Sequence, residues 1–73
     1  MVKINKKALI EAALFVSNKP LNPSYLSKLF SIPQKEVEEI LEEISLELKN
    51  EDRGIMMIKT LEGYELVVKP EYR

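Results

Sequence analysis

Cysteine, histidine and tryptophan are absent from this chain of 73 residues. Without cysteine, disulfide bonds and thiolate metal sites are excluded. Without histidine, the chain also lacks the commonest general base and metal ligand at neutral pH. No glycine-rich loop or activated serine offers another centre. The sequence therefore predicts a protein that is not an enzyme and has no cofactor.

Long apolar runs and a strong net charge are also missing. No stretch approaches the roughly 20 apolar residues of a membrane-spanning helix, and no signal-type run is present, which favours a cytoplasmic protein. The 11 lysine and arginine residues against 12 aspartate and glutamate residues give a formal net charge of −1. This balance gives nucleic acid no general electrostatic attraction. A core of this size is marginal, so oligomerisation or a second domain would add stability.

The stretch from Pro33 to Asn50 has the clearest periodicity. Its apolar residues recur at helical spacing: Val37, Ile40, Leu41, Ile44 and Leu48. This spacing predicts a helix with one buried stripe. Its other faces carry six glutamates and only two lysines. We expect this helix to hold the core together and to expose an acidic surface.

Two further helices precede it. After a lead-in from Met1 to Ile4, Asn5 is expected to cap a helix from about Lys6 to Ser17. Lys19 to Leu21 reads as a short extended piece, because Pro20 disfavours helical geometry before it. Asn22 and Pro23 then signal a second helix from about Pro23 to Phe30. We expect Leu26, Leu29 and Phe30 to be buried there, and Ile32 to fill the core after it.

A β-hairpin is predicted at the C-terminal end. The runs Ile55 to Leu61 and Tyr64 to Val68 alternate in the manner of strands, and Glu62 and Gly63 are expected to form the turn. This register pairs Leu61 with Tyr64. It puts Met57, Lys59, Leu66 and Val68 on one face, and Met56, Ile58 and Val67 on the other.

The predicted order is helix, extended piece, helix, tight turn, helix and hairpin. This is an α+β winged helix-turn-helix, with three helices and a C-terminal two-stranded β-wing, and residues 1–73 form a single domain. The third helix of this fold usually enters the DNA major groove, but its glutamates would oppose phosphates. A DNA-binding transcriptional regulator is therefore the alternative function, and we expect no sequence-specific DNA partner.

Apolar surface exceeds what one small core requires. The first helix is apolar around nearly its whole circumference, so it is either a central core helix or partly in contact with another subunit. On the wing, Met57 is expected to fill the core, whereas Met56 on the opposite face is expected to contact a partner. Protein association is thus the function that the residues favour.

Several ordered motifs resemble one family. They are IEAALFVS at residues 10–17 followed by Pro20-Leu21, EVEEILEE at residues 36–43, DRGI at residues 52–55, GYELV at residues 63–67 and KPEY at residues 69–72. Together they resemble the N-terminal winged-helix domain of the segregation and condensation protein B (ScpB) family. The helical motifs are weakly specific, but the ordered series spans nearly the whole chain.

This resemblance implies a dimerisation and protein-interaction module of an SMC–kleisin complex in chromosome segregation and condensation. It implies a homodimer that binds a kleisin subunit (ScpA-like) and, through it, the SMC ATPase at the nucleoid, with no membrane partner. It also implies that residues 1–73 are the N-terminal part of a longer two-domain protein. Combined with the surplus apolar surface, it predicts a dimer interface made of Ile10, Ala13, Leu14, Leu21, Met56, Ile58 and Val67.

Overall fold

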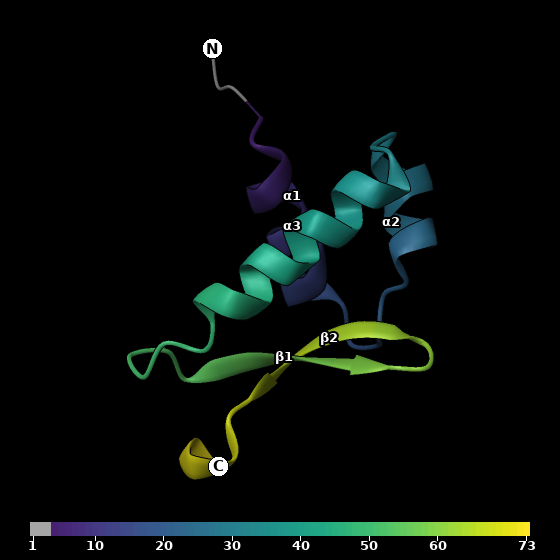
Figure 1. The fold of residues 1–73 in the computed structure, drawn as a ribbon. Coiled ribbons are helices and arrows are strands. Elements are labelled where there is room, and N and C mark those ends of the chain that lie inside the picture. Colours follow the sequence, from purple (N-terminus) through teal and green to yellow (C-terminus); the bar gives the residue numbers. More distant parts are fainter. Residues whose placement is uncertain (1–3) are drawn as a thin grey trace.

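The computed structural model describes residues 4–73, so the first three residues of the lead-in lie outside it. Its elements are α1 (Lys6–Val16), α2 (Pro23–Phe30), α3 (Gln34–Glu47), β1 (Ile55–Thr60), β2 (Gly63–Val68) and a short 3₁₀ helix, η1 (Pro70–Tyr72). The three helices gather on one side of the two strands (Figure 1). The predicted winged helix is confirmed.

Both predicted helix caps are present. The Asn5 side chain accepts hydrogen bonds from the backbone N–H groups of Lys7 and Ala8, at 2.9 and 3.1 Å. Asn22 accepts in the same way from the second and third residues of α2, at 2.7 and 3.3 Å. These bonds satisfy donors that the first turn of a helix leaves free. The sequence signals therefore locate the starts of α1 and α2 correctly.

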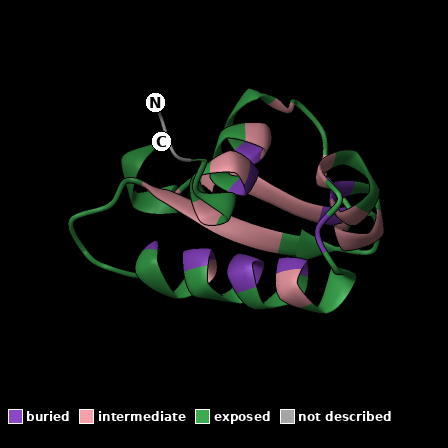
Figure 2. Cartoon of the chain, turned by 90° about the horizontal axis from the view of Figure 1, so that it is seen from above, coloured by how far each residue is buried: buried purple, intermediate pink, exposed green. Residues whose placement is uncertain are grey.

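The core lies between the helices and the wing. Its buried apolar residues are Ile10, Leu14, Leu21, Leu26, Ile32, Val37, Ile40, Leu41, Ile44 and Leu48. All five stripe residues predicted for α3 are among them, and they line the side of α3 that faces the strands (Figure 2). One expectation for α2 is wrong: Leu29 is 52% exposed, because only the face of this short helix that carries Leu26 meets α3.

The hairpin register differs from the prediction. Thr60 pairs with Gly63 and Lys59 with Tyr64, so Leu61 and Glu62 form the turn. The Thr60 hydroxyl stabilises this turn, since it accepts from the Glu62 N–H at 3.1 Å and donates to the Gly63 carbonyl at 3.2 Å. Each cross-strand partner is thus displaced by two residues. Because strand faces alternate with a period of two, the predicted division of residues between the two faces still holds.

Leu21, from the short extended piece between α1 and α2, adds a third strand position to the wing. Leu21 forms an isolated antiparallel bridge with Tyr64, and the two residues exchange N–H to carbonyl bonds of 2.8 Å in both directions. The bridge borders β2 at Gly63, whose φ is +144°. A Cβ on this glycine would lie 2.3 Å from the Leu21 carbonyl oxygen. Gly63 is therefore placed by this close backbone approach and not by the turn.

Candidate interaction surfaces

Three of the seven predicted interface residues lie in the core. Ile10, Leu14 and Leu21 are 0%, 3% and 8% exposed in the single chain. Ile10 and Leu14 occupy the side of α1 that faces the core, and Leu21 is buried beside its bridge to β2. Their side chains have no surface to offer a partner, so they stabilise the fold and do not form an interface.

Three others lie together on the outer face of the wing. The residues of the opposite face, Ile55, Met57, Tyr64 and Leu66, pack against the core. Strand alternation therefore directs Met56, Ile58 and Val67 away from the helices, and all three are half-buried. We name these three residues the wing patch. The remaining predicted residue, Ala13, is half-buried on α1 and packs against the core.

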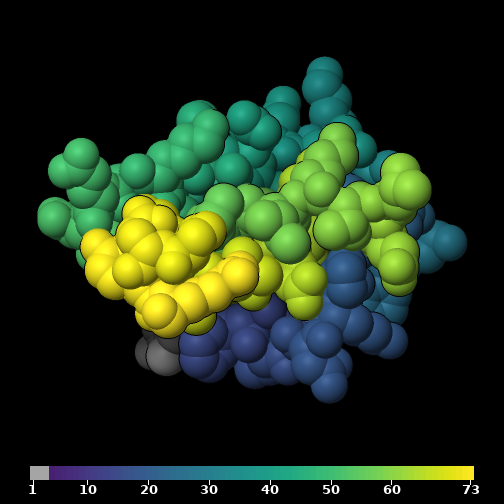
Figure 3. All heavy atoms as spheres, turned by 90° about the horizontal axis from the view of Figure 1, so that it is seen from below, coloured from purple at the N-terminus to yellow at the C-terminus, as the bar shows by residue number. Residues whose placement is uncertain are grey.

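The end of α1 carries apolar surface that the prediction missed. Phe15 and Val16 are 76% and 78% exposed, and they are the exposed large hydrophobic residues of this helix. We name these two residues the α1 patch. The only sequence signal for it is the apolar character of α1 around its circumference, which does not tell which side is covered. Seen from below, the molecule shows the wing in green beside α1 and its following segment in purple to blue (Figure 3).

The outward side of α3 is acidic, as predicted. Glu38, Glu39, Glu42 and Glu43 are all exposed. Glu36, nearer the core, pairs with Lys6 of α1 at 2.9 Å. Since phosphate binding requires cations, this surface opposes DNA at the position where the fold usually meets the major groove.

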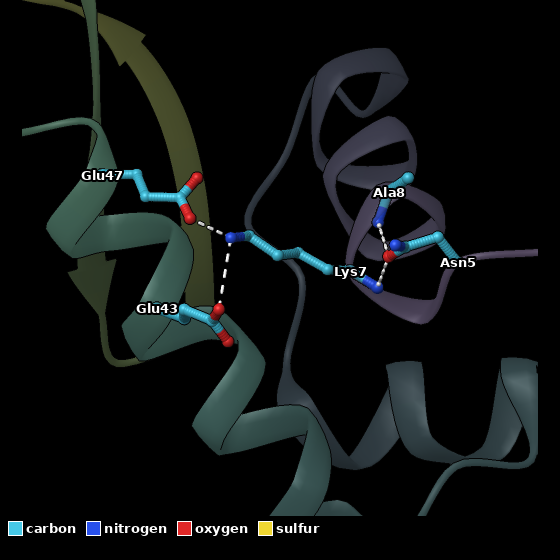
Figure 4. Close-up of polar contacts among 5 residues, drawn as sticks. All are labelled: Asn5, Lys7, Ala8, Glu43 and Glu47. Atoms are coloured by element: carbon cyan, nitrogen blue, oxygen red, sulfur yellow. Dashed lines mark hydrogen bonds and ion pairs between the residues drawn. The ribbon is translucent and has the colours of Figure 1, made fainter.

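A second ion cluster joins α1 to the C-terminal half of α3 (Figure 4). The Lys7 ammonium group bonds to the carboxylate of Glu47 and lies 3.3 Å from that of Glu43. The hydrogen bond with Glu47, followed by the bond and charge of Glu43, raises the pKa of Lys7 above its ordinary value despite partial desolvation. The cluster is solvated, so it orients α1 and α3 more than it stabilises them.

Two hollows lie between α3 and the wing. One, of about 550 Å³, lies where Glu38 and Glu42 of α3 approach Lys59 and the hairpin turn. The other, of about 790 Å³, lies where Ser45 and Leu48 approach Met56, Met57 and η1. Both are open grooves, and their position between an acidic helix and a strand suits a peptide more than a small molecule.

Residues 4–73 contain no group of three or more potential metal ligands in range of one ion. None of the helices within this range is long and apolar enough to span a membrane.

Solved structures share this architecture. The crystal structure of a dimer of the ScpB N-terminal domain complexed with ScpA peptide superimposes with a TM-score of 0.84 and 27% sequence identity, over 90% of this chain and 83% of that one. ScpB from Mycobacterium tuberculosis gives a TM-score of 0.86 at 24% identity, over 97% of this chain and 46% of that one. The second likeness concerns the fold alone.

Sequence comparison gives the same answer. Segregation and condensation protein B of Oceanobacillus iheyensis is 40% identical over 67 residues, which are 90% of this chain and 35% of that protein. A segregation and condensation protein B homolog of Coxiella burnetii is 33% identical over 76 residues, covering 99% of this chain and 35% of the relative. The chain thus spans about a third of the length of these relatives. The family model for segregation and condensation complex subunit ScpB matches residues 8–73, and the chain belongs to this family.

Proposed function

We propose that this domain is a non-enzymatic dimerisation and protein-interaction module of an SMC–kleisin chromosome segregation complex. The observation that carries the proposal is the likeness, over nearly the whole of both chains, to a domain crystallised as a dimer with an ScpA peptide. Its partners would be a second copy and a kleisin subunit and, through the kleisin, the SMC ATPase. This role places it in the cytoplasm, at the nucleoid.

Exposed apolar surface supports the dimer. The wing patch and the α1 patch belong to elements that share one side of the molecule (Figure 3). Phe15 and Val16 are each more than three quarters exposed. Exposed apolar surface of this kind marks protein interfaces in small domains, although the outer face of the wing also carries Glu65, opposite Ile58. We therefore propose that Phe15 and Val16 join Met56, Ile58 and Val67 at the dimer contact.

The acidic surface of α3 supports protein partners over DNA. Exposed glutamates repel phosphates, and among the described residues Lys59 is the one cation that lines the smaller hollow beside the two α3 glutamates. The proposal thus accounts for both the apolar and the acidic surfaces, whereas a DNA-binding regulator accounts for neither.

Light scattering across a concentration series tests the dimer directly. The 73-residue chain is expected to approach twice its mass of 8.5 kDa as concentration rises. A strict monomer at millimolar concentration would reject dimerisation. Co-elution with a purified kleisin from the same organism tests the partner. In parallel, a gel shift on random-sequence duplex DNA is expected to show no binding at moderate salt, and binding that weakens steeply with salt would restore the DNA-binding alternative.

A further inference from the structure

One edge of the wing has free backbone hydrogen-bonding groups. The strands follow the order Leu21, β2, β1, so β1 is an outer strand. Tyr64 uses both its N–H and its carbonyl on Leu21. Its cross-strand partner Lys59 therefore has no bond to Tyr64 and directs its own backbone groups away from β2. Hydrogen-bonded and non-hydrogen-bonded pairs alternate along an antiparallel ladder, so the backbone N–H and carbonyl groups of Ile55 and Met57 also point away from β2.

Nothing within residues 4–73 pairs with this edge. No backbone bond outside the ladder reaches Ile55, Met57 or Lys59 in the described part of the chain. Natural sheets blunt such edges with proline, bulges or several charges, because an open edge pairs with other strands. Here the strand reads IMMIKT and has one lysine. Its six residues give an open edge about 20 Å long.

The two hollows run beside this edge. Along α3, Glu38, Glu42 and Ser45 face the hollows at spacings of four and three residues, and thus follow one side of the helix. On the sheet, side chains at odd positions of β1 point towards the helices, and the wing patch lies on the other face. A strand added to β1 would therefore direct alternate side chains towards α3 and towards the side of the wing patch.

We propose that the free edge of β1 binds an extended segment of a partner protein as an added strand, with cationic side chains towards α3 and apolar side chains beside the wing patch. The charges around the hollows favour a cationic segment, because six carboxylates and three lysines line the two hollows. This mode of recognition uses main-chain bonds for affinity and alternate side chains for specificity. It goes beyond the proposed function, because it requires neither dimerisation nor a kleisin.

A second copy fits this edge poorly. Antiparallel pairing of two β1 strands requires a two-fold axis along the sheet normal, which puts both α3 helices on the same face of the joined sheet. The exposed Glu38 and Glu42 of one copy would then face those of the other. Such like-charge contacts oppose the pairing. A cationic segment meets no such repulsion.

The test uses an acetylated and amidated octapeptide of alternating lysine and valine as the probe. Titration into the 73-residue chain, followed by amide chemical shifts, is expected to perturb Met57 and Lys59 first. Two variants of equal charge isolate the backbone: Lys59→Pro removes the outward N–H, whereas Lys59→Ala keeps it. Proline is tolerated on an edge strand. We expect Lys59→Pro to bind the probe roughly tenfold more weakly than Lys59→Ala does.

A second measurement on the unmodified protein guards against misfolding of the proline variant. A probe with N-methyl groups on the amides that would face β1 is expected to lose binding, while a probe methylated on the other amides retains it. Equal affinity of both methylated probes, or of both Lys59 variants when folded, would overturn the added strand. Equal binding of an octapeptide of alternating glutamate and valine would overturn the cationic occupant.

Discussion

At the scale of single residues, Gly63 shows how a tertiary contact can override the turn preference of a glycine. A glycine near the end of a predicted hairpin is normally assigned to the turn. Here it lies in β2, opposite Thr60, because the backbone of Leu21 passes where a side chain would start. No pattern in the sequence announces that bridge, since it joins residues separated by more than forty positions. The wing register could therefore not be read from the hairpin alone.

Alanine at the two glycines is expected to have unequal effects. Gly63→Ala adds a Cβ against the Leu21 backbone at a positive φ and is expected to destabilise the fold by about 2 kcal/mol or more. Gly54→Ala meets nothing within 4 Å and has no positive φ, so its effect should stay within about 0.5 kcal/mol. Urea unfolding followed by circular dichroism measures both. Similar losses in the two variants would contradict the close approach at Gly63.

The raised pKa of Lys7 predicts a loss of stability at alkaline pH. The folded chain holds this proton more tightly than the unfolded chain, because Glu47 and Glu43 flank the ammonium group. The contribution of the cluster to the free energy of unfolding is thus complete below the ordinary lysine pKa. It is lost as the pH rises through the raised pKa of Lys7. Thermal melting of wild type and Lys7→Met should differ slightly at pH 8 and converge above the raised pKa. A difference that grows with pH would contradict this linkage.

At the scale of elements, α3 is the part that sequence predicts best. Its stripe is unambiguous because the opposite faces are uniformly charged, so only one orientation buries apolar surface. For α1 the reverse holds. Apolar residues surround it, and the sequence indicates that two sides must be covered without indicating which lies inside. The sequence therefore predicts Ile10 and Leu14 at the interface, although Phe15 and Val16 are the exposed large hydrophobic residues of α1. The predicted division of wing residues between the two faces is correct although the predicted register is wrong. The cross-strand partners are displaced by two residues, and strand faces alternate with a period of two.

Alanine substitutions at two leucines of α3 distinguish the contribution of core packing to stability from that of helix propensity. Leu41 is fully buried, whereas Leu46 is 57% exposed on the same helix. Leu41→Ala leaves a cavity and is expected to cost about 2–5 kcal/mol. Leu46→Ala keeps a strong helix former on the surface and should change stability by less than about 0.5 kcal/mol. Denaturant unfolding of both variants provides the comparison, and a small effect of Leu41→Ala would mean that α3 is not central to the core.

At the scale of the whole molecule, charge and apolar surface are partly segregated. α3 carries five exposed glutamates, while the wing patch and the α1 patch lie on other elements, where Glu65 and Glu11 are acidic neighbours. A net charge of −1 conceals this separation, because the lysines that balance it include Lys6 and Lys7, which pair with glutamates of α3. One molecule can thus associate through apolar contacts on one side while an acidic side stays available to a different partner.

This segregation predicts which substitutions dissociate the proposed dimer. Phe15→Glu and Val67→Glu place a charge in the apolar contact, and each is expected to weaken self-association at least about tenfold, because a buried unpaired charge is costly. Leu46→Glu introduces the same charge at an exposed leucine outside the two patches, on the acidic helix, and should leave the dimer intact. Light scattering gives the association constant, and circular dichroism confirms that each variant folds. If Leu46→Glu dissociated the dimer while Phe15→Glu and Val67→Glu did not, the contact would lie on α3 and the assignment of the two patches would be wrong.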